Sequence, residues 1–159
     1  MRDEFSEKLN REIDEAYRLI TEVEEAMLHS SKRLNVSIRE VHLLEKVADS
    51  GRMSISELAA AEGITTSSTT TAVNKLARKG FVEKSRDERD GRIVYVSLTK
   101  EGRFVDKLHR RFHRSMTYDV SQGLTEEEKE ALLKGLERLN GFLKNRAERQ
   151  NRLGKRDKK

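Results

Sequence analysis

The sequence contains no cysteine and no proline among its 159 residues. Without cysteine, the chain can form no disulfide, no thiolate metal site and no thiol-based nucleophile or redox sensor. Without proline, no residue interrupts a helix through a missing backbone N–H and a ring that clashes with the preceding turn. The two absences exclude thiol chemistry and favour long, uninterrupted helices.

Long apolar runs are missing as well. No stretch approaches the roughly 18 consecutive apolar residues of a membrane span, and residues 1–5 lack the apolar core of a signal peptide, so we expect a cytoplasmic protein without a membrane partner. Hydrophobic residues make up only 35% of the chain and charged residues 38%. Because so few apolar residues give a monomer little interior, the helices are expected to bury their apolar stripes in a homodimer.

The recognisable motifs of an enzyme are also lacking. The chain has no Gly-rich phosphate loop, and no paired carboxylates or Ser-His combination at a spacing that would support catalysis. We therefore predict no catalytic residues and no required cofactor. The positive charge is concentrated in residues 144–159, which hold eight Lys or Arg against two Asp or Glu. We expect residues 149–159 to form a basic, disordered tail that either solubilises the protein or strengthens non-specific DNA binding.

Helical periodicity dominates both ends of the chain. Apolar residues recur at steps of three and four from Phe5 to Met27, which predicts an amphipathic helix over residues 3–31. A second stripe, at steps of four from Phe104 to Val120, predicts a helix that begins at Thr99. Gly123 interrupts it, and Thr125 with Glu128 forms the capping box of a final helix.

Shorter helices are expected in the centre. Ser37 is predicted to cap a helix that ends near Gly51, and Ser56 to cap a helix over residues 57–62. Residues 64–79 are rich in Ser and Thr and could form a flexible linker. A helix is favoured because Thr65 is a good N-cap, Gly80 is a good terminator, and Thr69, Val73 and Leu76 share one face.

A β-hairpin follows this helix. Residues 81–84 and 93–98 are rich in β-branched and aromatic side chains, and Asp90-Gly91 between them predicts a two-residue type I′ turn. The order helix, turn, helix, hairpin predicts a mainly α fold with a small β-hairpin, a winged helix-turn-helix flanked by N- and C-terminal dimerisation helices. The hairpin would be the wing.

The outward face of the helix over residues 66–79 carries small hydroxyls, an amide and cations, which suit the major groove of DNA. Arginines at the hairpin would reach the neighbouring minor groove, and other cations would contact phosphates. The alternatives are a solvated hairpin whose acids and arginines pair with each other, and a winged-helix protein-interaction module. The predicted base readers are Thr66, Ser67, Thr70, Thr71 and Asn74; the phosphate contacts are Lys75, Lys84 and Arg86; the minor-groove residues are Arg89 and Arg92; and Asp87, Asp90 and Gly91 shape the wing.

From about Leu34 to Leu143, the chain resembles the MarR family of bacterial transcriptional regulators. The resemblance implies a homodimer with two winged helices on a palindromic double-stranded DNA operator, usually as a repressor. It divides the chain into an N-terminal dimerisation helix (1–36), a DNA-binding domain (37–103), C-terminal dimerisation helices (104–148) and the tail (149–159). It rests on Ser56-Glu57-Leu58-Ala59, Gly63-Ile64, Val73-Asn74-Lys75-Leu76, Lys79-Gly80, Leu98-Thr99-Lys100-Glu101-Gly102 and, as its most specific motif, Asp87-x-Arg89-x-x-Arg92.

Two effectors are consistent with the sequence. His109 and His113 have the i,i+4 spacing of zinc ligands on one helix, and with Glu24 and His42 they resemble the ligands of zinc-sensing repressors of this family. The alternative is that both histidines are polar residues that flank Phe112 on a packed helix.

The second effector is a fatty-acyl signal. Residues 39–42 and 108–113 resemble those of repressors of fatty-acid synthesis genes, for which acylated acyl carrier protein is the corepressor. That resemblance implies an acyl chain between the first, second and fifth helices, and an acidic carrier protein that faces Arg110, Arg111 and Arg114.

Overall fold

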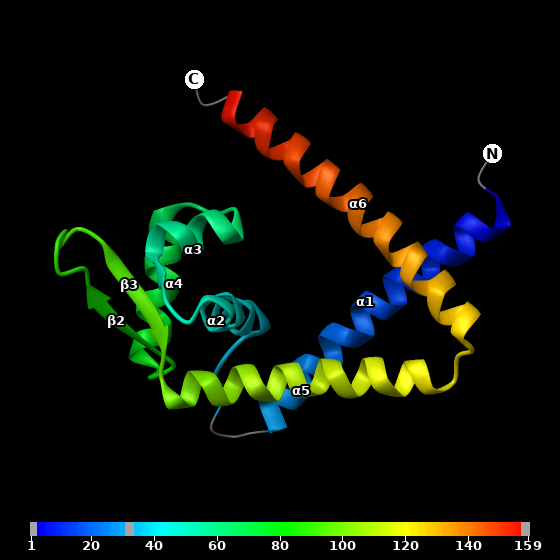
Figure 1. Ribbon diagram of the computed structural model, residues 1–159, viewed down its shortest axis with the longest axis horizontal. Coiled ribbons are helices and arrows are strands. Elements are labelled where there is room, and N and C mark those ends of the chain that lie inside the picture. Colours follow the sequence, from blue (N-terminus) through cyan, green and yellow to red (C-terminus); the bar gives the residue numbers. More distant parts are fainter. Residues whose placement is uncertain (1–2, 31–33, 157–159) are drawn as a thin grey trace. The chain divides into compact units, whose positions relative to one another are not determined.

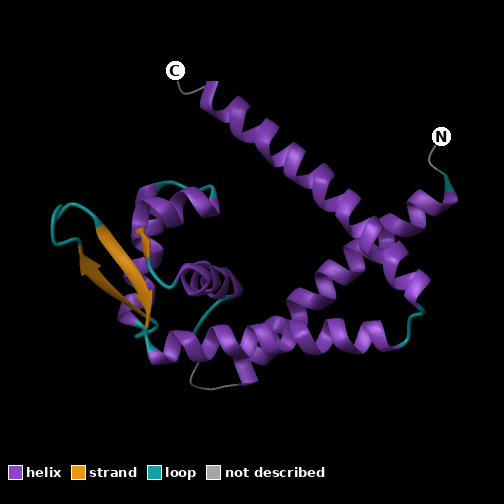
Figure 2. Ribbon diagram, in the orientation of Figure 1, coloured by secondary structure: helices purple, strands orange, loops and turns teal. Residues whose placement is uncertain are grey.

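The computed structural model describes residues 3–30 and 34–156, with side chains for residues 3–28 and 34–149. The described residues form helices and a small sheet (Figures 1 and 2). In chain order the elements are α1 (Glu4–Ser30), α2 (Ile38–Ser50), β1 (Met53–Ser54), α3 (Ile55–Glu62), α4 (Thr66–Arg78), β2 (Val82–Arg86), β3 (Val94–Leu98), α5 (Lys100–Gln122) and α6 (Glu126–Arg156). The predicted fold class, a mainly α winged helix-turn-helix, is confirmed.

The helix starts follow from capping residues. Ser37 caps α2, and its hydroxyl accepts from the Glu40 backbone N–H while the Glu40 carboxylate accepts from the Ser37 N–H. The same reciprocal box joins Ser54 and Glu57 at the start of α3. The predicted cap at Ser56 is therefore wrong by two residues. Ser54 can form the box because Glu57 follows it by three positions, the spacing that a capping box requires.

The Ser/Thr run forms a helix, as the favoured alternative predicted. Thr65 caps α4, and Thr69, Val73 and Leu76 are buried on one face. Burial of this stripe outweighs the tendency of Ser and Thr to bind their own backbone in extended conformations.

The hairpin belongs to a sheet in the strand order β1-β3-β2. Val82 pairs with Leu98 and Arg86 with Val94, both in antiparallel register, and the short strand β1 adds Met53 opposite Val96. Strand β1 was not predicted, because two residues carry too little periodicity to indicate a strand. The predicted type I′ turn at Asp90-Gly91 is wrong, since Gly91 does not have a positive φ. Strand pairing stops at Arg86 and Val94, so residues 87–93 form a longer loop between the strands.

The core lies between α2, α3, α4 and the sheet. Val41 and Leu44 of α2, Leu58 of α3, Val73 of α4 and Val96 of β3 are all at most 1% exposed. Figure 1 shows β2 and β3 projecting from this group of helices. The same core holds Leu28 of α1 and Val105 of α5. The packing therefore fixes the hairpin and α4 on one scaffold.

The chain divides into two compact units, residues 1–113 and 114–159, and α5 contributes to both. Within the second unit, α6 continues as far as Arg156, so the tail expected to be disordered from residue 149 is helical up to that point; residues 157–159 lie outside the described residues. Cations in a last helical turn favour a helix, because they oppose the macrodipole. The four-part domain division stays a prediction.

The apolar stripes of the long helices are exposed in the single chain. On α1, Phe5 is 72% exposed and Leu9 46%; on α6, Leu136 is 45% and Phe142 63% exposed. Exposed apolar faces of this kind mark surfaces for association. No helix among the described residues is long and apolar enough to cross a membrane.

Candidate nucleic-acid interface

The predicted base readers lie on the face of α4 that is opposite its buried stripe. Thr66, Ser67 and Thr71 are exposed, and Thr70 and Asn74 are half-buried. The fold holds this face in place, since Thr69 on the opposite side is fully buried. The structure therefore brings all five predicted readers onto one helix surface.

The threonine hydroxyls on this face are engaged within the helix. Thr70 donates to the carbonyl oxygen of Thr66 over 2.7 Å, and Thr71 donates to that of Ser67 over 3.1 Å. Helical threonines often form this i−4 bond. The hydrogen bonds to bases that the sequence suggested for these two residues would have to compete with the bonds to the backbone.

Asn74 is tied to the wing. The ammonium of Lys84 in β2 donates to Asn74 Oδ1 over 2.7 Å. An ammonium can only donate, so it fixes the orientation of the amide, with the NH₂ group on the other side. Lys84, predicted as a phosphate contact, is thus positioned beside the reading helix, where Thr71, Asn74, Arg78 and Lys84 line one hollow.

Lys75 of α4 has an acidic partner. Its Nζ lies 3.1 Å from Glu40 Oε1, and Lys79 Nζ lies 2.8 Å from Glu40 Oε2. Burial by itself raises the pKa of Glu40. Hydrogen bonds from Lys79, the Ser37 backbone and Lys75, with the charge of Lys79, outweigh that effect and hold the pKa below its ordinary value. Lys75 is still 55% exposed, so it is shared between this ion pair and the surface.

The wing loop is organised by aspartates. Asp87 Oδ1 accepts from the backbone N–H of Arg89 and of Asp90, each over 2.9 Å. These bonds, the one from Asp90 first, lower the pKa of Asp87. Asp90 in turn accepts from the backbone N–H of Arg92 over 3.0 Å, and the Arg92 side chain is 96% exposed. Arg92 Nε also lies 3.7 Å from Asp90 Oδ1. The aspartates therefore shape the loop, and the side chains of Arg89 and Arg92 stay exposed to solvent.

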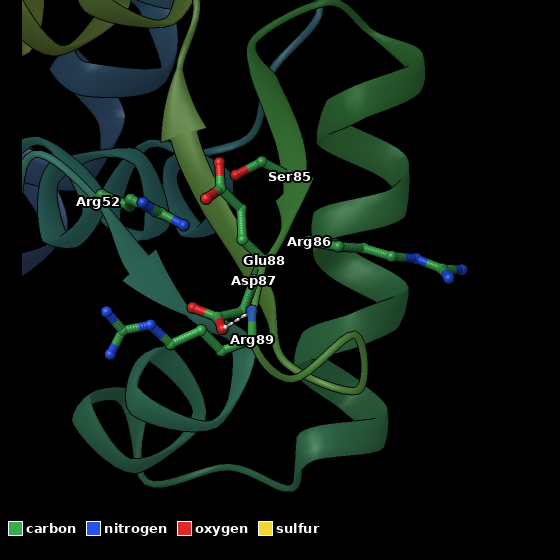
Figure 3. A pocket seen from close by; sticks show the side chains of 6 residues that line it. All are labelled: Arg52, Ser85, Arg86, Asp87, Glu88 and Arg89. Atoms are coloured by element: carbon green, nitrogen blue, oxygen red, sulfur yellow. Dashed lines mark hydrogen bonds between the residues drawn. The ribbon is translucent and has the colours of Figure 1, made fainter.

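The base of the wing holds a residue that the sequence reasoning missed. Arg52, between α2 and β1, places its guanidinium 3.8 Å from the centre of the Tyr95 ring. It lines a hollow with Ser85, Asp87 and Arg89, whereas Arg86 points away from Arg52 and Arg89 (Figure 3). The only signal that could have found Arg52 is the pairing of β1 with β3, which the sequence did not reveal.

A second group of functional candidates lies within the first unit. Glu24 of α1 and His109 of α5 are buried, and His113 is half-buried beside them. His109 Nε2 and His113 Nε2 lie 3.0 and 2.8 Å from Glu24 Oε1, and 3.1 Å from each other. Three of the four predicted metal ligands therefore meet. The fourth, His42, places its ring edge-on to that of His109, with centroids 5.6 Å apart.

Glu45 of α2 completes this group, and the sequence reasoning did not single it out. Its Oε1 lies 3.0 Å from His109 Nδ1, so both ring nitrogens of His109 face a carboxylate. A neutral imidazole can donate through only one nitrogen. With His113 Nε2 beside them, His109 Nε2 and the Glu24 carboxylate form a set of nitrogen and oxygen atoms that could hold a metal ion. Glu45 follows His42 by three positions, which places the two residues about one turn apart on α2. This helical spacing is the signal that could have identified Glu45 from the sequence.

Comparison with known proteins identifies the family. A sequence model of the MarR family matches residues 36–94. The chain is 30% identical over 118 residues to YfiV of Bacillus subtilis, an uncharacterized HTH-type transcriptional regulator, with 71% of each chain covered. The chain belongs to the MarR family. This MarR-family chain is accordingly a winged helix-turn-helix transcriptional regulator.

Further relatives agree with the family. The transcriptional regulator AdcR of Streptococcus pneumoniae is 25% identical over 119 residues, which cover 73% of this chain and 81% of AdcR. A crystal structure of Streptococcus pneumoniae FabT in complex with DNA is 32% identical, with a TM-score of 0.83, and covers 87% of this chain and 97% of FabT. A mutant of E. coli MarR complexed with operator DNA, 21% identical with a TM-score of 0.63, shows the shared fold.

Proposed function

We propose that this MarR-family regulator binds a palindromic double-stranded operator as a homodimer and represses transcription. The observation that best supports this proposal is that α4, the helix expected to read the bases, and the wing are held on one scaffold. α4 presents small polar side chains, and the aspartate-ordered wing leaves Arg89 and Arg92 in solvent. FabT, which is similar over nearly its whole length, was crystallised with DNA.

The dimer is part of the proposal. The exposed apolar residues of α1 and α6 need a partner surface, and a second copy of the chain would supply it. A two-fold dimer places two α4 helices on two half-sites, about one DNA turn or roughly 34–36 Å apart. The operator would then be a palindrome.

The experiment is selection of duplexes from a random library with the full-length protein, followed by affinity measurements at several salt concentrations. We expect a palindromic sequence and a salt-sensitive, specific complex. Arg92→Ala should weaken specific binding at least tenfold without altering the melting temperature. Arg111→Ala, an exposed arginine on α5, is the matched control and should leave affinity unchanged. Unchanged affinity for Arg92→Ala would contradict the role of the wing.

A second candidate function, zinc-responsive regulation, is favoured by the cluster of Glu24, His109 and His113. A tetrahedral zinc with bonds of about 2.0–2.1 Å holds its ligands about 3.3 Å apart, and the three ligand atoms here lie 2.8–3.1 Å apart. The residues therefore fit the ion. Glu45 would hold His109 in the tautomer that exposes the Nε2 lone pair. A bound zinc would link α1 to α5.

Zinc binding can be measured directly by competition with a chromophoric chelator. His113→Ala should abolish tight binding, and Glu45→Gln should weaken it by about 10–100-fold, since residues that orient a ligand have effects of that size. Glu22→Gln, an exposed carboxylate on α1, is the control. Equal zinc affinity for wild type and His113→Ala would overturn the candidate.

The predicted acyl signal stays a prediction. Two observations bear on it: a polar cluster occupies the space between α1, α2 and α5, and Arg110 is paired with Asp49 and Asp106 over 2.7 and 2.8 Å. An acyl chain in this space would have to separate buried polar groups from their partners, which is costly. If acylated acyl carrier protein changes operator affinity while zinc does not, the zinc candidate is replaced by the acyl one.

A further inference from the structure

The hydroxyls of Thr70 and Thr71 are turned back onto α4, so another part of each side chain faces outward. Thr70 Oγ1 lies 2.7 Å from the carbonyl oxygen of Thr66, and Thr71 Oγ1 lies 3.1 Å from that of Ser67. A threonine hydroxyl carries one proton. In both residues that proton is used inside the helix and is not offered to a ligand.

The two heavy substituents on a threonine Cβ occupy different staggered positions. When Oγ1 turns back to the carbonyl four residues earlier, the Cγ2 methyl takes another direction. Thr71 is exposed and Thr70 is half-buried, so both can be reached by a ligand. At each of these two positions the surface therefore presents a methyl group and the oxygen lone pairs, but no hydrogen-bond donor that is free to bind a ligand.

Among the four bases, only thymine presents a methyl group at its major-groove edge. We propose that Thr70 and Thr71 determine specificity by packing their methyl groups against thymine methyls, rather than by donating hydrogen bonds to bases. The inference rests on the proposed operator binding and deepens it. Donation to a base would first break a bond to the backbone, at a cost of about fivefold in affinity for each hydroxyl.

The test uses a duplex selected by the full-length protein, synthesised again with deoxyuridine in place of thymidine in both half-sites. This exchange removes only the thymine methyl. We expect thymines opposite α4 and a loss of about fourfold in affinity for each methyl contact. With one contact in each half-site, the loss for the duplex is about 15-fold.

Two substitutions at each threonine separate the methyl from the hydroxyl. Thr70→Val and Thr71→Val keep the methyl and remove the hydroxyl, so affinity and sensitivity to deoxyuridine should stay within twofold of wild type. Thr70→Ser and Thr71→Ser keep the hydroxyl and remove one methyl each, so each variant should discriminate less between thymidine and deoxyuridine duplexes. The double variant Thr70→Ser/Thr71→Ser should bind the two duplexes almost equally. Thr21, whose hydroxyl likewise donates to the Tyr17 carbonyl oxygen within α1, is the matched control: Thr21→Ser should retain full sensitivity.

The outcomes distinguish this inference from the proposed function. If no duplex is selected, the proposed function fails and the inference fails with it. If a duplex is selected but deoxyuridine has no effect, or if the valine variants lose affinity and the serine variants do not, operator binding stands and methyl readout is overturned.

Discussion

Replacing Glu40 by glutamine should destabilise the fold and strengthen non-specific DNA binding at the same time. The Glu40 side chain is 8% exposed and accepts hydrogen bonds from Lys79 and, at its edge, from Lys75. Glutamine can still close the capping box with Ser37, so the substitution removes mainly the negative charge. Lys79 is only 19% exposed, so its ammonium is largely shielded from water and is destabilised when its counter-charge is removed.

The magnitude follows from the two lysines. The pair with Lys79 lies between an exposed ion pair, worth about 0–1 kcal/mol, and a fully buried one, whose loss costs about 3–5 kcal/mol, so Lys79 accounts for a loss of about 1.5 kcal/mol. Lys75 is half-exposed and adds no more than about 0.5 kcal/mol. The total of about 2 kcal/mol corresponds to a fall of about 4–8 °C in melting temperature for a chain of this length.

Urea denaturation followed by circular dichroism, at a fixed protomer concentration, measures this loss. Glu57→Gln is a closely matched control, because Glu57 occupies the same capping-box position on α3 but is exposed. The difference in unfolding free energy between the two variants gives the contribution of the ion pairs that Glu40 forms with Lys75 and Lys79. If Glu40→Gln unfolds within about 0.5 kcal/mol of wild type, the ion pair does not stabilise the fold as argued.

The pH dependence of the unfolding free energy provides a second test of the ion pair, with a predicted direction. The folded pKa of Glu40 lies below its ordinary value of 4.5, so the stabilisation is fully present above that value and is lost as the pH falls through the folded pKa. The gap in unfolding free energy between wild type and Glu40→Gln should therefore close below pH 4.5. In DNA titrations, Lys75 freed from Glu40 should steepen the salt dependence by about 0.9 for each protomer.

Two other substitutions test the wing and the core. Asp87→Ala should weaken operator affinity in anisotropy titrations while the melting temperature stays constant. Asp87 orders only the exposed loop, through the N–H groups of Arg89 and Asp90. Retained affinity would show that DNA binding does not need the loop to be ordered in this way. Gly102→Ala should lower stability by about 1–3 kcal/mol in thermal melts, since its Cβ would lie 2.1 Å from the Phe81 carbonyl oxygen, whereas Gly135→Ala on α6 meets no neighbour within 4 Å and should not destabilise the protein.

The central helices show why much of the fold could be predicted from the sequence. A capping box needs a Ser or Thr and a Glu three residues apart, as Ser37 and Glu40 are, and a buried stripe needs apolar side chains at helical spacing. These signals are contained in a few neighbouring residues. The prediction of the wing turn was wrong because it, too, used only neighbouring residues. Asp90-Gly91 is a strong local signal for a tight turn. The side chain of Asp87, and the hydrogen bond from the Asp87 N–H to the Ile93 carbonyl oxygen, instead stabilise a longer loop.

The candidate sites depended on contacts between distant parts of the chain. The sequence by itself determined the order of helices and strands, the cation-rich wing and the residue types on α4, because spacing and capping along the chain decide these. Only the tertiary structure decided that Glu40 meets Lys79, that Glu45 joins Glu24 at His109, and that Lys84 orients Asn74. Which charged side chains meet depends on how whole helices pack against each other. The spacing of residues within one helix does not give the distances between helices.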